Sequence, residues 1–200
     1  MFENILMEKV YFAHPVNIYG QLIETAFQKL IADYLTSGDM SKIENPNQPH
    51  HQVGYDNYAK RQKESGLTHK GMSYFYDEVL PKCGGCVGVP FLDGRLGLGV
   101  AGEMQWFIKH NLPVWKVILL VNSEEEGTEN LNNYFQFGYF SVRRITSNES
   151  SDILDNHPKL VVPHEETRLR TWEIYNRVRR PYETAHLVKM PIPEGFYLED

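Results

Sequence analysis

Apolar residues along this chain cluster in short runs, which alternate with segments of helical periodicity. The short runs lie at 9–15 (KVYFAHP), 86–91 (CVGVPF), 113–121 (PVWKVILLV) and 139–145 (YFSVRRI). The run at 113–121 has almost no polar residue, as expected of a strand covered on both faces. These runs predict four strands, and 42–45 (KIEN) predicts a short additional strand.

Between the predicted strands, apolar residues recur every three or four positions and predict amphipathic helices. These helices are expected at 20–34, 68–80 and 100–111. The polar stretch 46–66 is too long for an ordinary connection, so we expect an irregular loop that lies over a functional site. A second, acidic loop is expected at 122–133.

The order of these elements predicts an α/β fold with a doubly wound parallel sheet of five strands. This α/β domain is expected to span 1–147. The remaining segment, 148–200, is predicted to form an arm that packs on the domain or on a partner subunit. The arm contains an arginine-rich helix at about 165–180 and an extended tail. Its arginines are either a solvated helix face or a phosphate-binding surface.

Composition and charge narrow the class of partners. The chain has 200 residues, 42% of them hydrophobic, which is enough for one domain with a core. Its formal net charge of −6 does not indicate a nucleic-acid polymer or a membrane surface as partner. No apolar run approaches the ~18 residues of a membrane span, and the N-terminus lacks the features of a signal peptide. We therefore expect a cytoplasmic protein.

The sequence KCGGCVGV contains the two cysteines of the chain, Cys83 and Cys86. Two neighbouring cysteines make no disulfide framework. A zinc site would need further ligands from His50, His51 or His69, but no second ligand pair has a recognisable spacing. A redox CxxC normally opens a helix, whereas this one leads into a predicted strand. We interpret Cys83 and Cys86 as two structural thiols at the start of a strand, and we expect the protein to bind no metal or cofactor.

A glycine-rich turn precedes Glu103 in GRLGLGVAGEMQWFIKHNLPVW (94–115). The turn contains Gly94, Gly97, Gly99 and Gly102. Because glycine has no side chain, these positions would allow the predicted substrate to approach the backbone closely. In a first helical turn the dipole would keep Glu103 ionised, ready to act as a nucleophile or to stabilise an oxocarbenium-like centre. A first-turn acid is also explained as a simple dipole partner. The GxGxxG pattern follows the third strand, so it does not indicate a dinucleotide site.

Further candidate site residues follow the predicted strands, where open parallel sheets bind ligands. Tyr11, His14 and Pro15 lie at the end of the first strand. His14 is either a general acid or hydrogen-bond donor to a sugar or phosphate of the substrate, or a loop histidine bonded to backbone. Asp56 in the long polar stretch is either a sugar or phosphate contact or a solvated residue. Asp93 belongs to an Asp-Gly turn, which turn formation alone explains.

Two of these segments resemble the nucleoside 2-deoxyribosyltransferase-like superfamily, which includes deoxynucleoside 5′-monophosphate N-glycosidases. YFAHP (11–15) resembles the first-strand motif, with His14 replacing the usual glycine. GVAGEMQWFIKHNLPV (99–114) resembles the segment that carries the glutamate of the family. The resemblance covers about residues 9–120. It implies a flavodoxin/Rossmann-like fold, cleavage of the N-glycosidic bond of a (deoxy)nucleoside or nucleotide, and a homo-oligomer.

The resemblance also implies roles for individual residues. Glu103 would attack the anomeric carbon, and Tyr11 would position it. Water would then complete hydrolysis, whereas a second base would complete transfer. The family aspartate that assists the leaving base has no counterpart in RLGLGV, so Asp93 and Asp56 are the candidates for that role.

Three other functions stay open. An NAD glycohydrolase would use a related fold and also a glutamate. A non-catalytic nucleotide sensor or scaffold is favoured by the missing aspartate and by His14. A zinc or thiol-redox function of Cys83 and Cys86 ranks last.

Overall fold

The computed structural model describes the chain in five segments: 9–20, 22–67, 72–91, 94–119 and 140–163. Asp93, the acidic loop expected at 122–133 and the arginine-rich helix expected at about 165–180 lie outside these residues. Among the described residues, no helix combines the length and apolar character needed to cross a bilayer.

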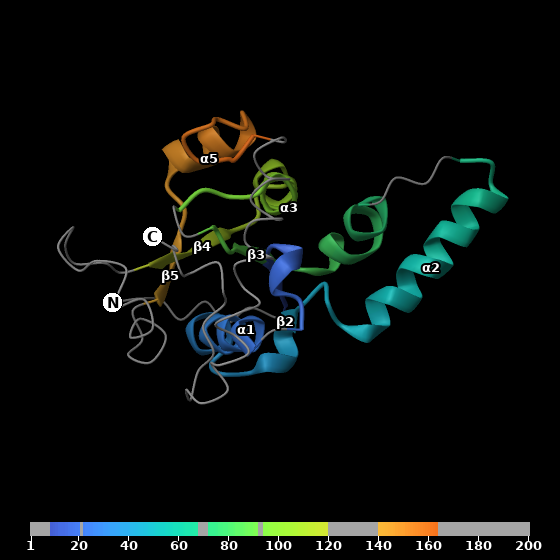
Figure 1. Cartoon of the computed structure of the whole chain (residues 1–200), viewed down its shortest axis with the longest axis horizontal. Coiled ribbons are helices and arrows are strands. Elements are labelled where there is room, and N and C mark those ends of the chain that lie inside the picture. Colours follow the sequence, from blue (N-terminus) through green and yellow to red (C-terminus); the bar gives the residue numbers. More distant parts are fainter. Residues whose placement is uncertain (1–8, 21, 68–71, 92–93, 120–139, 164–200) are drawn as a thin grey trace, which may run out of the picture.

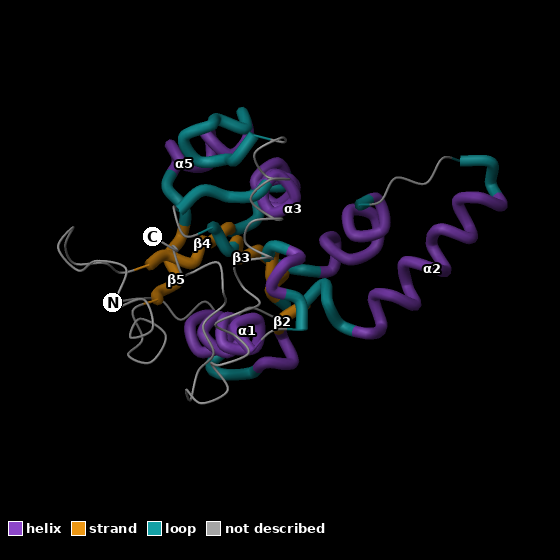
Figure 2. Tube along the Cα trace, in the orientation of Figure 1, coloured by secondary structure: helices purple, strands orange, loops and turns teal. Residues whose placement is uncertain are grey.

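A five-stranded sheet in the order β2-β1-β3-β4-β5 forms the centre of the fold (Figure 2). Its strands are β1 (Val10–Ala13), β2 (Ile43–Glu44), β3 (Gly85–Gly88), β4 (Val114–Leu119) and β5 (Phe140–Arg144). The pairs β1–β2, β1–β3 and β3–β4 are parallel. The predicted α/β class and the five strands of the sheet are confirmed.

The prediction of a fully parallel sheet was wrong at β5, which pairs antiparallel to β4. An antiparallel neighbour needs no crossover helix, so alternation of apolar runs alone does not reveal its direction. In this register Lys116 on β4 lies opposite Arg143 on β5. Glu149 contacts both cations, at 2.8 Å from Nζ of Lys116 and 2.7 Å from Nη1 of Arg143, and so offsets their repulsion.

Helices cover both faces of the sheet (Figure 1). Within the described segments the longer helices are α1 (Leu22–Leu35), α2 (Pro49–Glu64), α3 (Leu98–Lys109) and α5 (Ser147–Leu154). The described residues also form four short helical turns, which lie between strands and helices: η1 (Val16–Ile18), η2 (Met40–Lys42), η3 (Phe75–Val79) and η4 (Leu80–Lys82). In Figure 1, α1 lies on one side of the sheet and α3 with α5 on the other.

Successive side chains of β1 point to opposite faces of the sheet and pack against different helical layers. Val10 and Phe12 belong to the core cluster that includes residues of α1, whereas Tyr11 and Ala13 belong to the cluster that includes residues of α3. All four residues are buried, as expected of a central strand whose successive side chains point to opposite faces. The α3 face therefore receives the hydroxyl of Tyr11.

The polar stretch 46–66 was expected to be a loop, but most of it is the helix α2. Pro49 occupies its first turn, where a missing N–H costs nothing. His51 and Tyr58 are its buried residues, so the helix shows no continuous apolar stripe. The helix extends away from the sheet (Figure 1). A helix that is solvated on most sides lacks the periodicity that predicts helices.

Of the helix predicted at 68–80, residues 68–71 lie outside the described residues. The π-helical turn η3 and the tight turn η4 replace a regular helix here. They pack against α2 through the pairs Tyr58–Asp77 and Arg61–Glu78. Gly54 is required at this contact, because a Cβ there would overlap with the hydroxyl of Tyr74.

Replacing Gly88 with alanine is expected to destabilise the fold by about 1–3 kcal/mol through overpacking. A Cβ at Gly88 would overlap with Sδ of Met104, which is fully buried on α3. Urea unfolding followed by circular dichroism measures the change. Gly99→Ala is the matched control, because a Cβ at Gly99 meets nothing within 4 Å. Equal midpoints for the two variants would contradict the expectation.

Candidate functional site

Tyr11 and Glu103 meet between the sheet and α3, although 92 positions separate them in the sequence. The hydroxyl of Tyr11 donates a hydrogen bond of 2.7 Å to Oε1 of Glu103. Both side chains are buried. β1 directs Tyr11 toward α3, and the second turn of α3 directs Glu103 toward the sheet. The structure thus brings together two of the residues that the sequence predicted for a catalytic site.

Burial raises the pKa of Glu103 to about 8, and the hydrogen bond from Tyr11 only partly opposes this shift. The expectation that the helix dipole would keep Glu103 ionised was therefore wrong. α3 begins at Leu98, so Glu103 lies beyond the first turn, where the dipole effect has declined. Among the described residues, no cation contributes to the pKa of this carboxyl. Glu103 is consequently protonated at neutral pH.

Two further phenols and one thiol surround Glu103. Burial and the Glu103 carboxyl raise the pKa of Tyr76 to about 12, and the same two causes raise the pKa of Cys86 well above its usual value. Burial, Glu103 and Glu24 raise the pKa of Tyr19. These groups were not predicted, and the sequence signal that could have revealed Cys86 is its position on β3, where it pairs with Tyr11.

His14 belongs to a separate polar cluster at the end of β1. Its Nε2 lies 3.1 Å from Oδ1 of Asn45 and 3.5 Å from Oε1 of Glu24. Nδ2 of Asn45 donates to Oε1 of Glu24 at 2.8 Å. Burial lowers the pKa of His14, although Asn45 and Glu24 partly oppose this. Tyr19 connects the two clusters, because its ring packs against His14 and its hydroxyl interacts electrostatically with both Glu103 and Glu24.

The remaining predicted site residues are dispersed. The carbonyl of Pro15 accepts the N–H of Ile18 in η1. Asp56 is exposed on α2 and accepts a hydrogen bond from Gln52 one turn earlier. Their predicted contacts with a substrate stay predictions.

The predicted glycines lie around the start of α3. Gly97 is its buried N-cap and Gly99 is exposed. A Cβ at Gly102 would lie 2.8 Å from the hydroxyl of Tyr76, so a glycine at this position allows Tyr76 to approach Glu103. Gly94 has a φ of 80°, which favours glycine in this turn.

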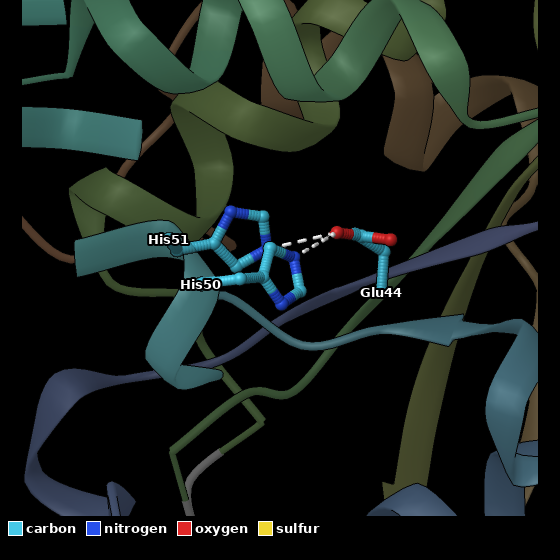
Figure 3. A group of neighbouring side chains, drawn as sticks. All are labelled: Glu44, His50 and His51. Atoms are coloured by element: carbon cyan, nitrogen blue, oxygen red, sulfur yellow. Dashed lines mark hydrogen bonds and ion pairs between the residues drawn. The ribbon is translucent and has the colours of Figure 1, made fainter. Parts of the chain in front are cut away.

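A third polar cluster lies where α2 begins and consists of Glu44, His50 and His51 (Figure 3). Both histidines direct Nε2 toward Oε1 of Glu44, at 3.2 Å for His50 and 2.8 Å for His51. Lys9 pairs with the other carboxylate oxygen. Burial alone would raise the pKa of Glu44, but its contacts with His51, Lys9 and His50 outweigh burial and lower it to about 2. From the sequence, these histidines were candidates only for a zinc site shared with the cysteines.

The cysteines do not join this cluster. Among the described residues, the group of side chains whose donor atoms could share one metal ion contains Glu44, His50 and His51 and no thiol. Cys83 and Cys86 are buried and unpaired by a disulfide. Burial raises the pKa of Cys83 to about 12, which disfavours a reactive thiolate.

The hydrogen bond from Tyr11 holds the neutral Glu103 carboxyl in one orientation. A positive charge that forms beside this carboxyl would lower its pKa and favour the loss of its proton. Among the described carboxyl groups, that of Glu103 has the most strongly raised pKa. Perturbed carboxyl groups of this kind are typical of functional sites. Comparisons with protein-family models, with curated proteins and with solved structures found no match.

Proposed function

We propose that this protein cleaves or transfers the N-glycosidic bond of a (deoxy)nucleoside or nucleotide, with Glu103 as the nucleophile and Tyr11 as the residue that positions it. The observation that carries the proposal is the buried Glu103 carboxyl, whose hydrogen bond comes from a phenol and not from a cation. The resemblance of 11–15 and 99–114 to the nucleoside 2-deoxyribosyltransferase-like superfamily supports the same residues in these roles.

The charge of the transition state explains why such a carboxyl suits this reaction. As the bond between C1′ and the base breaks, positive charge develops on the sugar. A carboxyl that has no counter-charge in the free protein gains most from this charge, because the interaction forms only in the transition state. Oε1 of Glu103 accepts the Tyr11 hydrogen bond, and within the described residues Oε2 has no such donor. Oε2 is therefore the oxygen proposed to attack.

The proposed reaction has two steps. In the first, Glu103 that has lost its proton to solvent forms a bond from Oε2 to C1′ while the C1′–N bond breaks, and the base leaves with the electron pair and takes up a proton. In the second, water or a nitrogen of another base displaces the Glu103 carboxylate from C1′ and loses a proton to solvent. Asp93 and Asp56 stay the predicted proton donors to the base.

Base release from a substrate panel tests the proposal. The purified protein is incubated with nucleosides, deoxynucleosides, their 5′-monophosphates and NAD, each with and without a second free base. Chromatography then follows the free base and any new nucleoside. A released base supports a glycosidase and identifies its substrate, and a new nucleoside supports a transferase. If no substrate releases its base, catalysis is contradicted.

The rate of base release is expected to rise with pH and to level off above about pH 8, because Glu103 must lose its proton before it can attack. Tyr11→Phe removes the hydrogen bond that opposes the raised pKa of Glu103. In this variant the profile should move to higher pH while the plateau stays measurable. The measurement is kcat/KM between pH 5 and 9.5. A rate that falls above pH 8 would instead indicate that Glu103 acts as an acid.

A non-catalytic nucleotide-binding protein is the second candidate. The raised pKa of Glu103 favours it, because a protonated carboxyl cannot act as a nucleophile but can donate a hydrogen bond to a ligand. Calorimetric titration with the same panel separates the two functions. Tight binding without base release over hours would favour the second candidate.

A further inference from the structure

We propose that Glu44, His50 and His51 form a binding site for a divalent transition-metal ion. Glu44 ends β2, and the histidines lie in the first turn of α2. Between these elements the chain turns tightly, because Oδ1 and the carbonyl of Asn45 accept the N–H groups of Asn47 and Gln48. This turn places both imidazoles beside one carboxylate (Figure 3).

The donor atoms have separations that fit a small ion. Ligands at the usual Zn²⁺ distances, in a tetrahedral arrangement, lie about 3.3 Å apart. The Nε2 atoms of His50 and His51 lie 3.2 Å and 2.8 Å from Oε1 of Glu44. All three donor atoms lie within 4.8 Å of one another. Only a small outward movement of the side chains would therefore admit an ion between them.

An independent observation comes from His51, whose exposed fraction is only 3%. Its Nε2 is buried and makes no hydrogen bond of acceptable geometry with any described residue, although Oε1 of Glu44 is close. Such an atom is costly unless a ligand satisfies it. Nδ1 of His51 lies 3.2 Å from the hydroxyl of Tyr74. A proton on Nδ1 that is shared with Tyr74 leaves the lone pair of Nε2 directed at the site.

Lys9 does not close the site. It pairs with Oε2 of Glu44, whereas the histidines converge on Oε1. Its side chain is 40% exposed, so it can move toward solvent. The side chain of His50 is 61% exposed, which gives an ion and its water ligands access from outside. Two imidazoles and one carboxylate favour Zn²⁺, Fe²⁺ or Co²⁺ over Mg²⁺ and Ca²⁺. This proposal does not depend on the proposed function.

Calorimetric titration of the full chain with Zn²⁺, after treatment with a chelator, tests the proposal. We expect one Zn²⁺ per chain and an affinity that falls at least about 100-fold in Glu44→Gln and in His51→Ala. Tyr74→Phe should lower the affinity about 10-fold, because it removes the partner of Nδ1. His110→Ala, which removes the exposed histidine that caps the C-terminus of α3, is the matched control and should bind normally. Circular dichroism verifies that each variant is folded.

Cobalt spectroscopy keeps the test decisive if a variant fails to fold. Co²⁺ bound to the unmodified chain should show d–d absorption without a thiolate charge-transfer band, since no cysteine belongs to the site. A thiolate band would overturn the proposal in favour of Cys83 or Cys86. Absence of stoichiometric binding, or Zn²⁺ affinity that is unchanged in folded Glu44→Gln and His51→Ala, would also overturn it, and the cluster would then be an ion-pair network.

Discussion

Glu103→Gln is expected to lower the rate of base release by about 10⁴-fold or more, because an amide cannot form the covalent bond to C1′. Glutamine has nearly the shape of the protonated carboxyl, and its Oε1 can still accept the hydrogen bond from Tyr11. The fold and the affinity for substrate should therefore persist. Single-turnover assays with the substrate found in the panel measure the loss.

Glu64→Gln makes the same chemical change on the exposed side of α2 and is the control for this experiment. It should release base at the rate of the unmodified protein. Retained turnover in Glu103→Gln would remove Glu103 from the role of nucleophile. Equal losses in both variants would indicate damage to the fold and not to the chemistry.

Glu103→Gln is also expected to stabilise the fold at alkaline pH, although it removes catalysis. The pKa of Glu103 is about 8 in the folded state, compared with an ordinary value of 4.5. A raised folded-state pKa means that its contribution to stability is complete below pH 4.5 and is lost as the pH rises toward 8. The loss is about 1.4 kcal/mol per pH unit and reaches about 4 kcal/mol at pH 8. Glutamine has no proton to lose.

Urea unfolding of both proteins between pH 4 and 9 measures this effect. The difference between the two free energies of unfolding should be small at pH 4 and should grow until about pH 8, where Glu103→Gln is the more stable protein. Parallel curves would show that Glu103 titrates at its ordinary pKa.

Glu149→Gln is expected to change the free energy of unfolding in the opposite direction to Glu103→Gln. Hydrogen bonds from Arg143 are the largest cause that lowers the pKa of Glu149, and Lys116 also contributes. A lowered folded-state pKa means that stability is present above the ordinary value of 4.5 and is lost as the pH falls. This variant should therefore be less stable than the unmodified protein above pH 4.5.

The sequence predicted best those elements whose apolar residues are buried by the sheet. The runs that became β1, β3 and β4 lie in the core, and burial on both faces is the property that the apolar pattern records. It failed for α2, whose residues mostly face solvent, and for the direction of β5, which depends on tertiary pairing. The local pattern of hydrophobic residues therefore predicts neither a helix that faces solvent on most sides nor the direction of a strand.

For the candidate site, the sequence predicted the residues Tyr11 and Glu103 but not the environment of Glu103. The position of Glu103 near a helix start suggested the helix dipole as the main influence on its pKa, whereas burial in the tertiary structure dominates that pKa. Tyr19 and Cys86 escaped prediction for the same reason. The cluster of Glu44, His50 and His51 was missed because 46–66 was expected to be a loop, which gives no fixed position to a histidine.

The protonated carboxyl of Glu103 would also couple the binding of a cationic ligand to the release of a proton. At pH 7 a group with a pKa of about 8 holds roughly 0.9 proton. A cationic ligand, such as an iminosugar, would lower that pKa and expel the proton to the buffer. The heat of binding would then differ between buffers of different ionisation enthalpy, and the slope of that dependence would count the protons that leave Glu103.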